Sequence, residues 1–241
     1  MEDQRFLNRF SFEALAQGQQ GVPMPPTTQT IEQMPAKVDE QPELLRSLSL
    51  FAVFGCIMLA VSIVIADFVV PDHDWITDTI SDLGAGRYEF IVDMGLYAFS
   101  AALIGLAVLA SHVHLGEWDW SVGIVSLIVF GLLVFLVGAR NEYGDNDSEG
   151  WVIHVYLVYS IGLAMTVVCF AFARGAARAS PRYRAILIAT GSVWLVSAPV
   201  FFFLPTDVDG IYERYLGAVS FVLILTLAHL FMQRAKQRKA N

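Results

Sequence analysis

The sequence is poor in cysteine and in positive charge. Its 241 residues include only two cysteines, and 15 Lys and Arg against 23 Asp and Glu, which gives a formal net charge of -8. Cys56 and Cys169 lie within apolar runs, where we expect small buried side chains and not a disulfide or a metal site. The few basic residues gather in loops and in the C-terminal tail, which fits membrane topology and does not indicate binding to nucleic acid.

Recognisable catalytic motifs are lacking as well. The sequence has no Gly-rich phosphate loop and no zinc-protease helix, and Ser81 is not framed by the glycines of a nucleophile elbow. We predict no cleavable signal peptide, because the first apolar run begins only near Ser47, after a polar and acidic leader. Motifs alone therefore assign no reaction and no cofactor.

Apolar residues, in contrast, are abundant. They make up 56% of the chain, and the mean hydropathy is +0.56, which is typical of a polytopic membrane protein. They form six runs of about 18 to 24 residues, and a helix of this length crosses a hydrocarbon core of roughly 30 Å. We predict an all-α bundle of six transmembrane helices, at about residues 47–70, 90–113, 120–139, 151–173, 185–204 and 215–232.

Three regions follow from this pattern. Residues 1–46 are rich in Pro, Gln and charge, and we predict a mostly disordered N-terminal tail. Residues 47–233 form the transmembrane domain, and residues 234–241 form a basic C-terminal tail. Within the second span, small residues should let a neighbouring helix approach closely; these are Gly95, Ala98, Ala101, Ala102 and Gly105.

The distribution of Lys and Arg predicts the orientation. With a cytoplasmic N-terminus, the outer loops hold only Arg87, Arg140 and Arg214. Near the ends of the spans, the inner segments then hold ten basic residues, and such a bias marks the cytoplasmic side. We therefore expect both termini in the cytoplasm and the protein in the plasma membrane. The inner basic residues are Lys37, Arg46, Arg174, Arg178, Arg182, Arg184, Arg234, Lys236, Arg238 and Lys239.

A short amphipathic helix is predicted on the outer side, between the first two spans. In residues 72–84, Asp74 is a suitable N-cap and Gly84 a suitable C-cap. Ile76, Ile80 and Leu83 recur at helical spacing, which gives the segment one apolar face.

Acidic residues and histidines also gather on the predicted outer face. Such a cluster can bind a metal ion, but acidic outer loops are expected from the positive-inside bias alone, and we favour this second interpretation. Asp67 and Asp93 are notable because a carboxylate inside a bundle requires a partner, such as one of the three outer arginines. The candidate site residues are Asp67, His73, Ser81, Asp82, Asp93, Asp145, His154, Asp207, Glu213 and Arg214; the metal-ligand candidates among them are His73, His154 and Asp82.

Two of these regions resemble a known family. The run 79–84, Thr-Ile-Ser-Asp-Leu-Gly, resembles the bacterial and archaeal membrane family called domain of unknown function 998. Further similar features are His154 at the start of the fourth span and the run 210–214, Gly-Ile-Tyr-Glu-Arg, before the sixth. The resemblance covers about residues 47–232 and implies a prokaryotic six-helix membrane protein without an assigned activity. After the third span the chain departs from the Phe-Pro-x-Asp turn frequent in the family.

Three functions remain open from the sequence. The first is an accessory or assembly subunit, in contact with the lipid bilayer, that binds a membrane-protein partner through residues 1–46. The second is an outer-facing metal-dependent hydrolase of a lipid or amide, with His73, His154, Asp82, Asp145 and Asp207 as ligands and bases. The third, a small transporter, fits least because the midplane is almost wholly apolar.

Overall fold

The computed structural model describes residues 40–139 and 153–240. Within these ranges the chain is helical, and six helices are long and apolar enough to cross a membrane, as predicted. The predicted residue Asp145 and most of the predicted tail, residues 1–39, lie outside the described part of the chain. The helices are α1 (Pro42–Val69), the short α2 (Ile80–Leu83), α3 (Phe90–Val113), α4 (Trp118–Ala139), α5 (Ile153–Ala176), α6 (Pro181–Phe201) and α7 (Asp209–Ala240).

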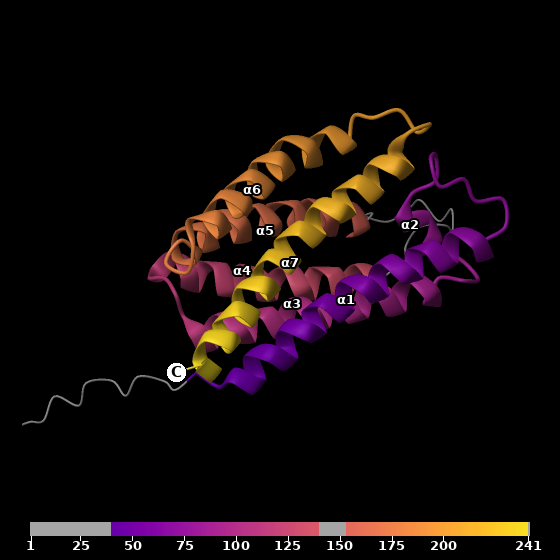
Figure 1. The fold of residues 1–241 in the computed structure, drawn as a ribbon. Coiled ribbons are helices and arrows are strands. Elements are labelled where there is room, and N and C mark those ends of the chain that lie inside the picture. Colours follow the sequence, from indigo (N-terminus) through magenta and orange to yellow (C-terminus); the bar gives the residue numbers. More distant parts are fainter. Residues whose placement is uncertain (1–39, 140–152, 241) are drawn as a thin grey trace, which may run out of the picture. The chain divides into compact units, whose positions relative to one another are not determined.

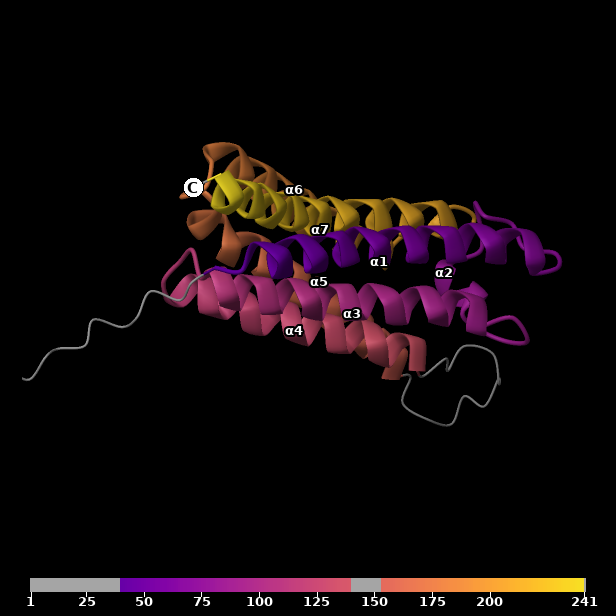
Figure 2. The ribbon, with the colours of Figure 1, turned by 60° about the horizontal axis from the view of Figure 1, so that its bottom comes forward.

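The six long helices form a closed ring. Helix α1 packs against α3, and each following helix packs against the next along the chain, so that α3 contacts α4, α4 contacts α5, and α5 contacts α6. Helix α7 completes the ring by packing against both α6 and α1, as Figures 1 and 2 show. All six long helices contribute residues to the wall of one cavity.

Small residues set the spacing between α1 and α3. A Cβ added at Gly55 would lie 2.8 Å from the carbonyl oxygen of Ala98, and one added at Gly95 would lie 3.0 Å from Cα of Leu59. The two backbones are therefore too close for any larger side chain at these positions. The close approach predicted for the second span is confirmed, and α1 is the neighbour.

The helices are longer at one end than predicted. Helix α1 begins at Pro42, within the predicted tail, and α7 continues through the basic residues 234–239. Glu40 lies between Arg234 and Arg238, at 2.8 Å from Nη2 of the former and 3.0 Å from Nε of the latter. We call this end of the bundle, where residue 40 and the C-terminal part of α7 meet, the terminal end. The opposite end, which carries α2, is the α2 end.

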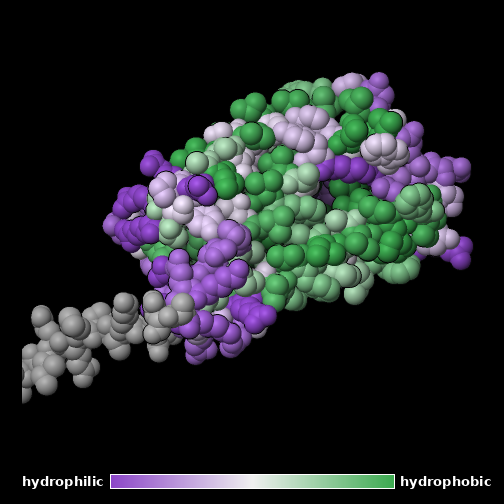
Figure 3. Space-filling model, in the orientation of Figure 1, coloured by the Kyte–Doolittle hydropathy of each residue, from purple (hydrophilic) through white to green (hydrophobic). Residues whose placement is uncertain are grey.

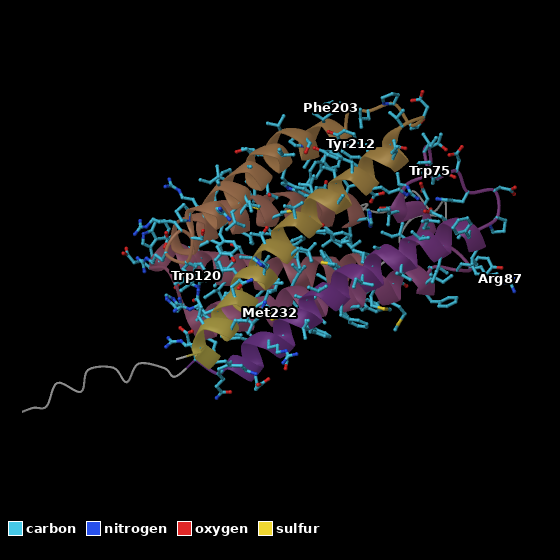
Figure 4. All side chains as sticks on the ribbon, in the orientation of Figure 1. Trp75, Arg87, Trp120, Phe203, Tyr212 and Met232 are labelled. Atoms are coloured by element: carbon cyan, nitrogen blue, oxygen red, sulfur yellow. The ribbon has the colours of Figure 1, made fainter. Side chains whose placement is uncertain are left out.

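The surface of the bundle has the polarity expected of a membrane protein. Apolar residues cover the middle of the helices, and hydrophilic residues gather toward both ends in the view of Figure 3. Trp75 and Phe203, which are 54% and 86% exposed, lie at the α2 end (Figure 4), and Trp118, which is 73% exposed, begins α4 toward the other end. Aromatic side chains near both boundaries are typical of membrane interfaces. The chain is therefore a multi-pass membrane protein.

The predicted outer amphipathic helix is present, but it is shorter and begins later than expected. Its N-cap is Thr79 and not Asp74, whose carboxylate instead accepts a hydrogen bond from the amide of Ile76 within a turn. Gly84 is the C-cap, as predicted. Thr79 and Asp82 form a reciprocal capping box, a signal that the Thr-x-x-Asp spacing carries and that could have placed this helix correctly.

Candidate functional site

The α2 end is organised by the first residues of α7. Gly210 allows the backbone of the 74–79 loop to approach, since a Cβ there would lie 2.9 Å from the carbonyl oxygen of Ile76 and even closer to that of Asp78. The amide of Ile211 then donates a hydrogen bond of 3.0 Å to the carbonyl of Ile76. The run Gly-Ile-Tyr-Glu-Arg at residues 210–214 thus places two charged side chains, Glu213 and Arg214, against the loop and α2.

Glu213 supplies the hydrogen-bond acceptor that stabilises the start of α2. Its Oε2 accepts hydrogen bonds from the amides of Ile80, at 2.6 Å, and Ser81, at 3.4 Å. Amides at a helix start have no partner within the helix, so a carboxylate there satisfies them. Its other oxygen, Oε1, accepts a hydrogen bond of 3.3 Å from the Ser81 hydroxyl.

Ser81 also connects α2 to α5. Its Oγ lies 3.2 Å from Nε2 of His154, which is 5% exposed at the start of α5. Ser81, His154 and Glu213 therefore meet, although they come from three separate helices. The sequence placed His154 at the start of the fourth span, but it did not identify Ser81 as its partner.

Arg214 forms a second, adjacent group. Its Nη2 donates to Oδ1 of Asp67 at 2.5 Å, and its Nη1 donates to the carbonyl oxygens of Asp78 and Gly210 at 2.9 and 3.0 Å. His73 completes the group, with Nε2 at 3.1 Å from Asp67 Oδ1 and 3.2 Å from Arg214 Nη2. The carboxylate of Asp67, near the end of α1, thus has the arginine partner expected from its position.

These two groups lie at one end of a large cavity. The cavity has a volume of about 740 Å³, and Asp67, Ser81, His154, Glu213 and Arg214 supply its charged and histidine-containing end. The remaining walls are mostly apolar, with each long helix contributing. Examples, one from each of α1, α3, α4, α5, α6 and α7, are Leu59, Phe99, Phe130, Val158, Leu195 and Phe221. The sequence of any single span does not predict this cavity, because residues of several helices line it.

The other predicted site residues lie elsewhere. Asp82 is engaged in the capping box, where its Oδ2 accepts from the amide and hydroxyl of Thr79 at 2.8 and 2.7 Å. Asp93, in the first turn of α3, and Asp207, exposed in the turn before α7, do not line the cavity. His73 is buried in the Arg214 group and does not line the cavity itself.

The three metal-ligand candidates do not come together. His73 contacts Asp67 and Arg214, Asp82 contacts Thr79, and His154 contacts Ser81. Within residues 40–139 and 153–240, no group of three or more His, Cys, Asp or Glu side chains has a geometry that could hold a metal ion.

Comparison with known proteins gives a family and no activity. No curated protein and no solved structure matches the chain. The model of one family matches residues 53–230, which span α1 to α7 and include both groups at the α2 end. That family is described as "Protein of unknown function (DUF998)". The chain is thus a multi-pass membrane protein that belongs to the DUF998 family.

Proposed function

We propose that this protein binds an amphiphilic lipid in its central cavity. The apolar chain of the ligand would lie between the helices, and its head would lie against Ser81, His154 and Glu213. The observation that carries the proposal is the cavity itself: about 740 Å³, apolar along its length and polar at one end. Its volume falls within the roughly 300–1,000 Å³ typical of ligand pockets. An apolar cavity in a bilayer is filled more favourably by an alkyl chain than by water.

The three functions suggested by the sequence receive different support. A metal-dependent hydrolase lacks a gathered ligand set among the described residues. A transporter requires polar groups along a path, whereas the charged residues of this cavity lie at one end. The partner-binding role of residues 1–46 concerns a region mostly outside the described chain, and it stays a prediction that is compatible with lipid binding.

The proposal also specifies where the protein works. The bias of Lys and Arg toward the terminal end supports an orientation in which that end is cytoplasmic and the α2 end faces outward. The head of the ligand would then lie near the outer leaflet of the plasma membrane.

Two glycines make the proposal testable. Gly162 in α5 and Gly217 in α7 line the cavity, and a Cβ added at either position has no atom within 4 Å. Gly217→Leu and Gly162→Leu should therefore fill the cavity without disturbing the packing. We expect the wild-type protein, purified in mild detergent, to retain lipid detectable by native mass spectrometry, and the double variant to retain at least about tenfold less.

The control variant is Val125→Leu, on the exposed face of α4 and away from the cavity, which should retain lipid as the wild type does. Equal lipid retention by the wild type and by the double variant would contradict the proposal, as would a wild-type protein that carries no lipid after purification and takes none up on reconstitution.

A further inference from the structure

The charge at the polar end of the cavity limits which lipids fit. Two carboxylates, Asp67 and Glu213, line this end together with a single guanidinium, that of Arg214. We propose that the head of the ligand is a hydrogen-bonding group without negative charge, a hydroxyl or an amine, and that phosphate-headed lipids are rejected. This inference rests on the proposed function and concerns the same cavity.

Arg214 is not available for an anionic head. Its Nη1 donates to two backbone carbonyls, and its Nη2 forms the ion pair with Asp67. Its Nε is buried and does not reach the cavity surface. A phosphate at this end would therefore have to displace Asp67 from its partner, and the displaced carboxylate would be left in a site of low polarity. Breaking a buried ion pair by taking away one partner is strongly unfavourable.

Glu213 adds a direct repulsion. Its carboxylate accepts three hydrogen bonds, from two amides of α2 and from the Ser81 hydroxyl, while the neighbouring Arg214 guanidinium is already bonded to Asp67. Two like charges near each other in a site of low dielectric repel strongly. A lipid phosphate beside Glu213 would therefore be disfavoured even if Arg214 were free.

The same side chains can bind a ligand head that donates hydrogen bonds. A carboxylate offers about four acceptor sites, of which Glu213 uses three, so one remains for a hydroxyl or ammonium group. The Ser81 hydroxyl and the His154 ring, 3.2 Å apart, add a pair that can donate or accept according to the ligand. A neutral or cationic head thus gains bonds where an anionic head gains repulsion.

The test compares lipids that differ only in the head. Full-length protein is freed of lipid by detergent exchange, and binding is measured by native mass spectrometry for monooleoylglycerol and for its phosphorylated counterpart, lysophosphatidic acid with the same chain. Oleylamine and oleic acid form the second pair, which compares a cationic amine head with an anionic carboxylate head. We expect the uncharged or cationic member of at least one pair to bind about tenfold more tightly or better. In Glu213→Gln this preference should shrink, and in the control Asp207→Asn, whose carboxylate is outside the cavity, it should not change.

The outcomes separate the two proposals. If the wild type binds the anionic member of both pairs as tightly as its counterpart, the inference about the head fails while lipid binding stands. If no probe binds, the proposed function itself fails. If the wild type discriminates and a folded Glu213→Gln discriminates equally, Glu213 is not the cause. Because the wild-type comparison needs no variant, the inference stays testable even if Glu213→Gln does not fold.

Discussion

Single residues at the start of α7 hold the α2 end together. Gly210 lets the loop approach, Ile211 bonds to it, Glu213 caps α2, and Arg214 binds Asp67. The remaining residue of this run, Tyr212, donates its hydroxyl to the carbonyl of Ser197 on α6 at 3.0 Å. Each of the five positions in 210–214 therefore has a structural role. A change at one of these positions should act on the loop and not only on α7.

Gly210→Ala should destabilise the protein. The added Cβ would meet the carbonyl oxygens of Ile76 and Asp78, so the loop must move and the bond from Ile211 must lengthen. Such overpacking costs about 1–3 kcal/mol. Thermal unfolding in detergent should therefore show a lower Tm. Gly217→Ala, in the same helix but in open space, should leave the Tm almost unchanged, and an equal loss in both variants would contradict this explanation.

Asp67 and Arg214 should be energetically coupled. Their side chains are only 21% and 15% exposed, so removing one charge leaves the other unpaired in a region of low polarity. In a double-mutant cycle with Asp67→Asn and Arg214→Gln, we expect a coupling energy of about 0.5–3 kcal/mol. The comparison pair is Glu117 and Arg174, each 60% exposed, for which we expect about 0–1 kcal/mol. Similar coupling in both pairs would show that burial at the α2 end has no effect.

Elements are connected at the terminal end by charges that the sequence did not single out. Glu40 precedes α1 and is 8% exposed, and it holds two arginines of α7. Burial raises the pKa of this carboxyl, but the hydrogen bonds from Arg238 and Arg234 outweigh burial and lower the pKa to about 2. The ion pair thus fixes the first helix to the last at the end opposite to the cavity's polar groups.

Acid should loosen this connection. The ordinary pKa of Glu40 is 4.5, so its contribution to stability is complete above about pH 4.5 and is lost as the pH falls toward 2. The Tm of the wild type should therefore fall more than that of Glu40→Gln between pH 6 and pH 3, while at pH 7 the variant should be less stable by about 1–3 kcal/mol. Glu43→Gln, which removes an exposed carboxylate paired with Lys239, is the matched control. A parallel pH dependence in wild type and Glu40→Gln would rule out this role.

The spans could be predicted from the sequence, whereas the cavity and most partners of the polar groups could not, and the difference has a physical reason. Spans were predictable because a helix in lipid must be long and apolar at every position, so the signal lies in each segment by itself. The polar groups were found residue by residue, but of their partners only an arginine for Asp67 was expected. Ser81 and His154 are 73 residues apart, and only the packing of the helices brings them together. The cavity was unpredictable for the same reason, since six helices line it and none encloses it alone.

The described part of the molecule has six helices that can span a membrane, and the start of α1 and the C-terminal part of α7 lie at the same end of the bundle. The ion pairs of Glu40 with Arg234 and Arg238 join the start of α1 to the C-terminal part of α7. The ring of helices α1, α3, α4, α5, α6 and α7 also places every long helix next to the central cavity. Orientation then decides which leaflet meets the polar end of the cavity.

The predicted orientation can be tested with two cysteine variants. Thr206→Cys lies in the exposed turn at the α2 end, and Gln237→Cys lies on the exposed face of α7 at the terminal end. The native Cys56 and Cys169 are buried and should not react. In intact cells, we expect a membrane-impermeant thiol reagent to label Thr206→Cys, and to label Gln237→Cys only after permeabilisation. The reverse pattern would place both termini outside, and labelling of both variants in intact cells would contradict an even number of spans.

The ion pair between Asp67 and Arg214 also has a consequence for biogenesis. The two residues are 147 positions apart, so the carboxylate of α1 enters the membrane long before its arginine is synthesised. Until α7 is in place, Asp67 has His73 beside it but lacks the guanidinium of Arg214, and the amides at the start of α2 have no carboxylate to donate to. A chain truncated before Asp209 would keep this defect permanently. Quality-control proteases that recognise polar groups in the bilayer would then have a signal for incomplete chains, and the arrival of α7 would remove it.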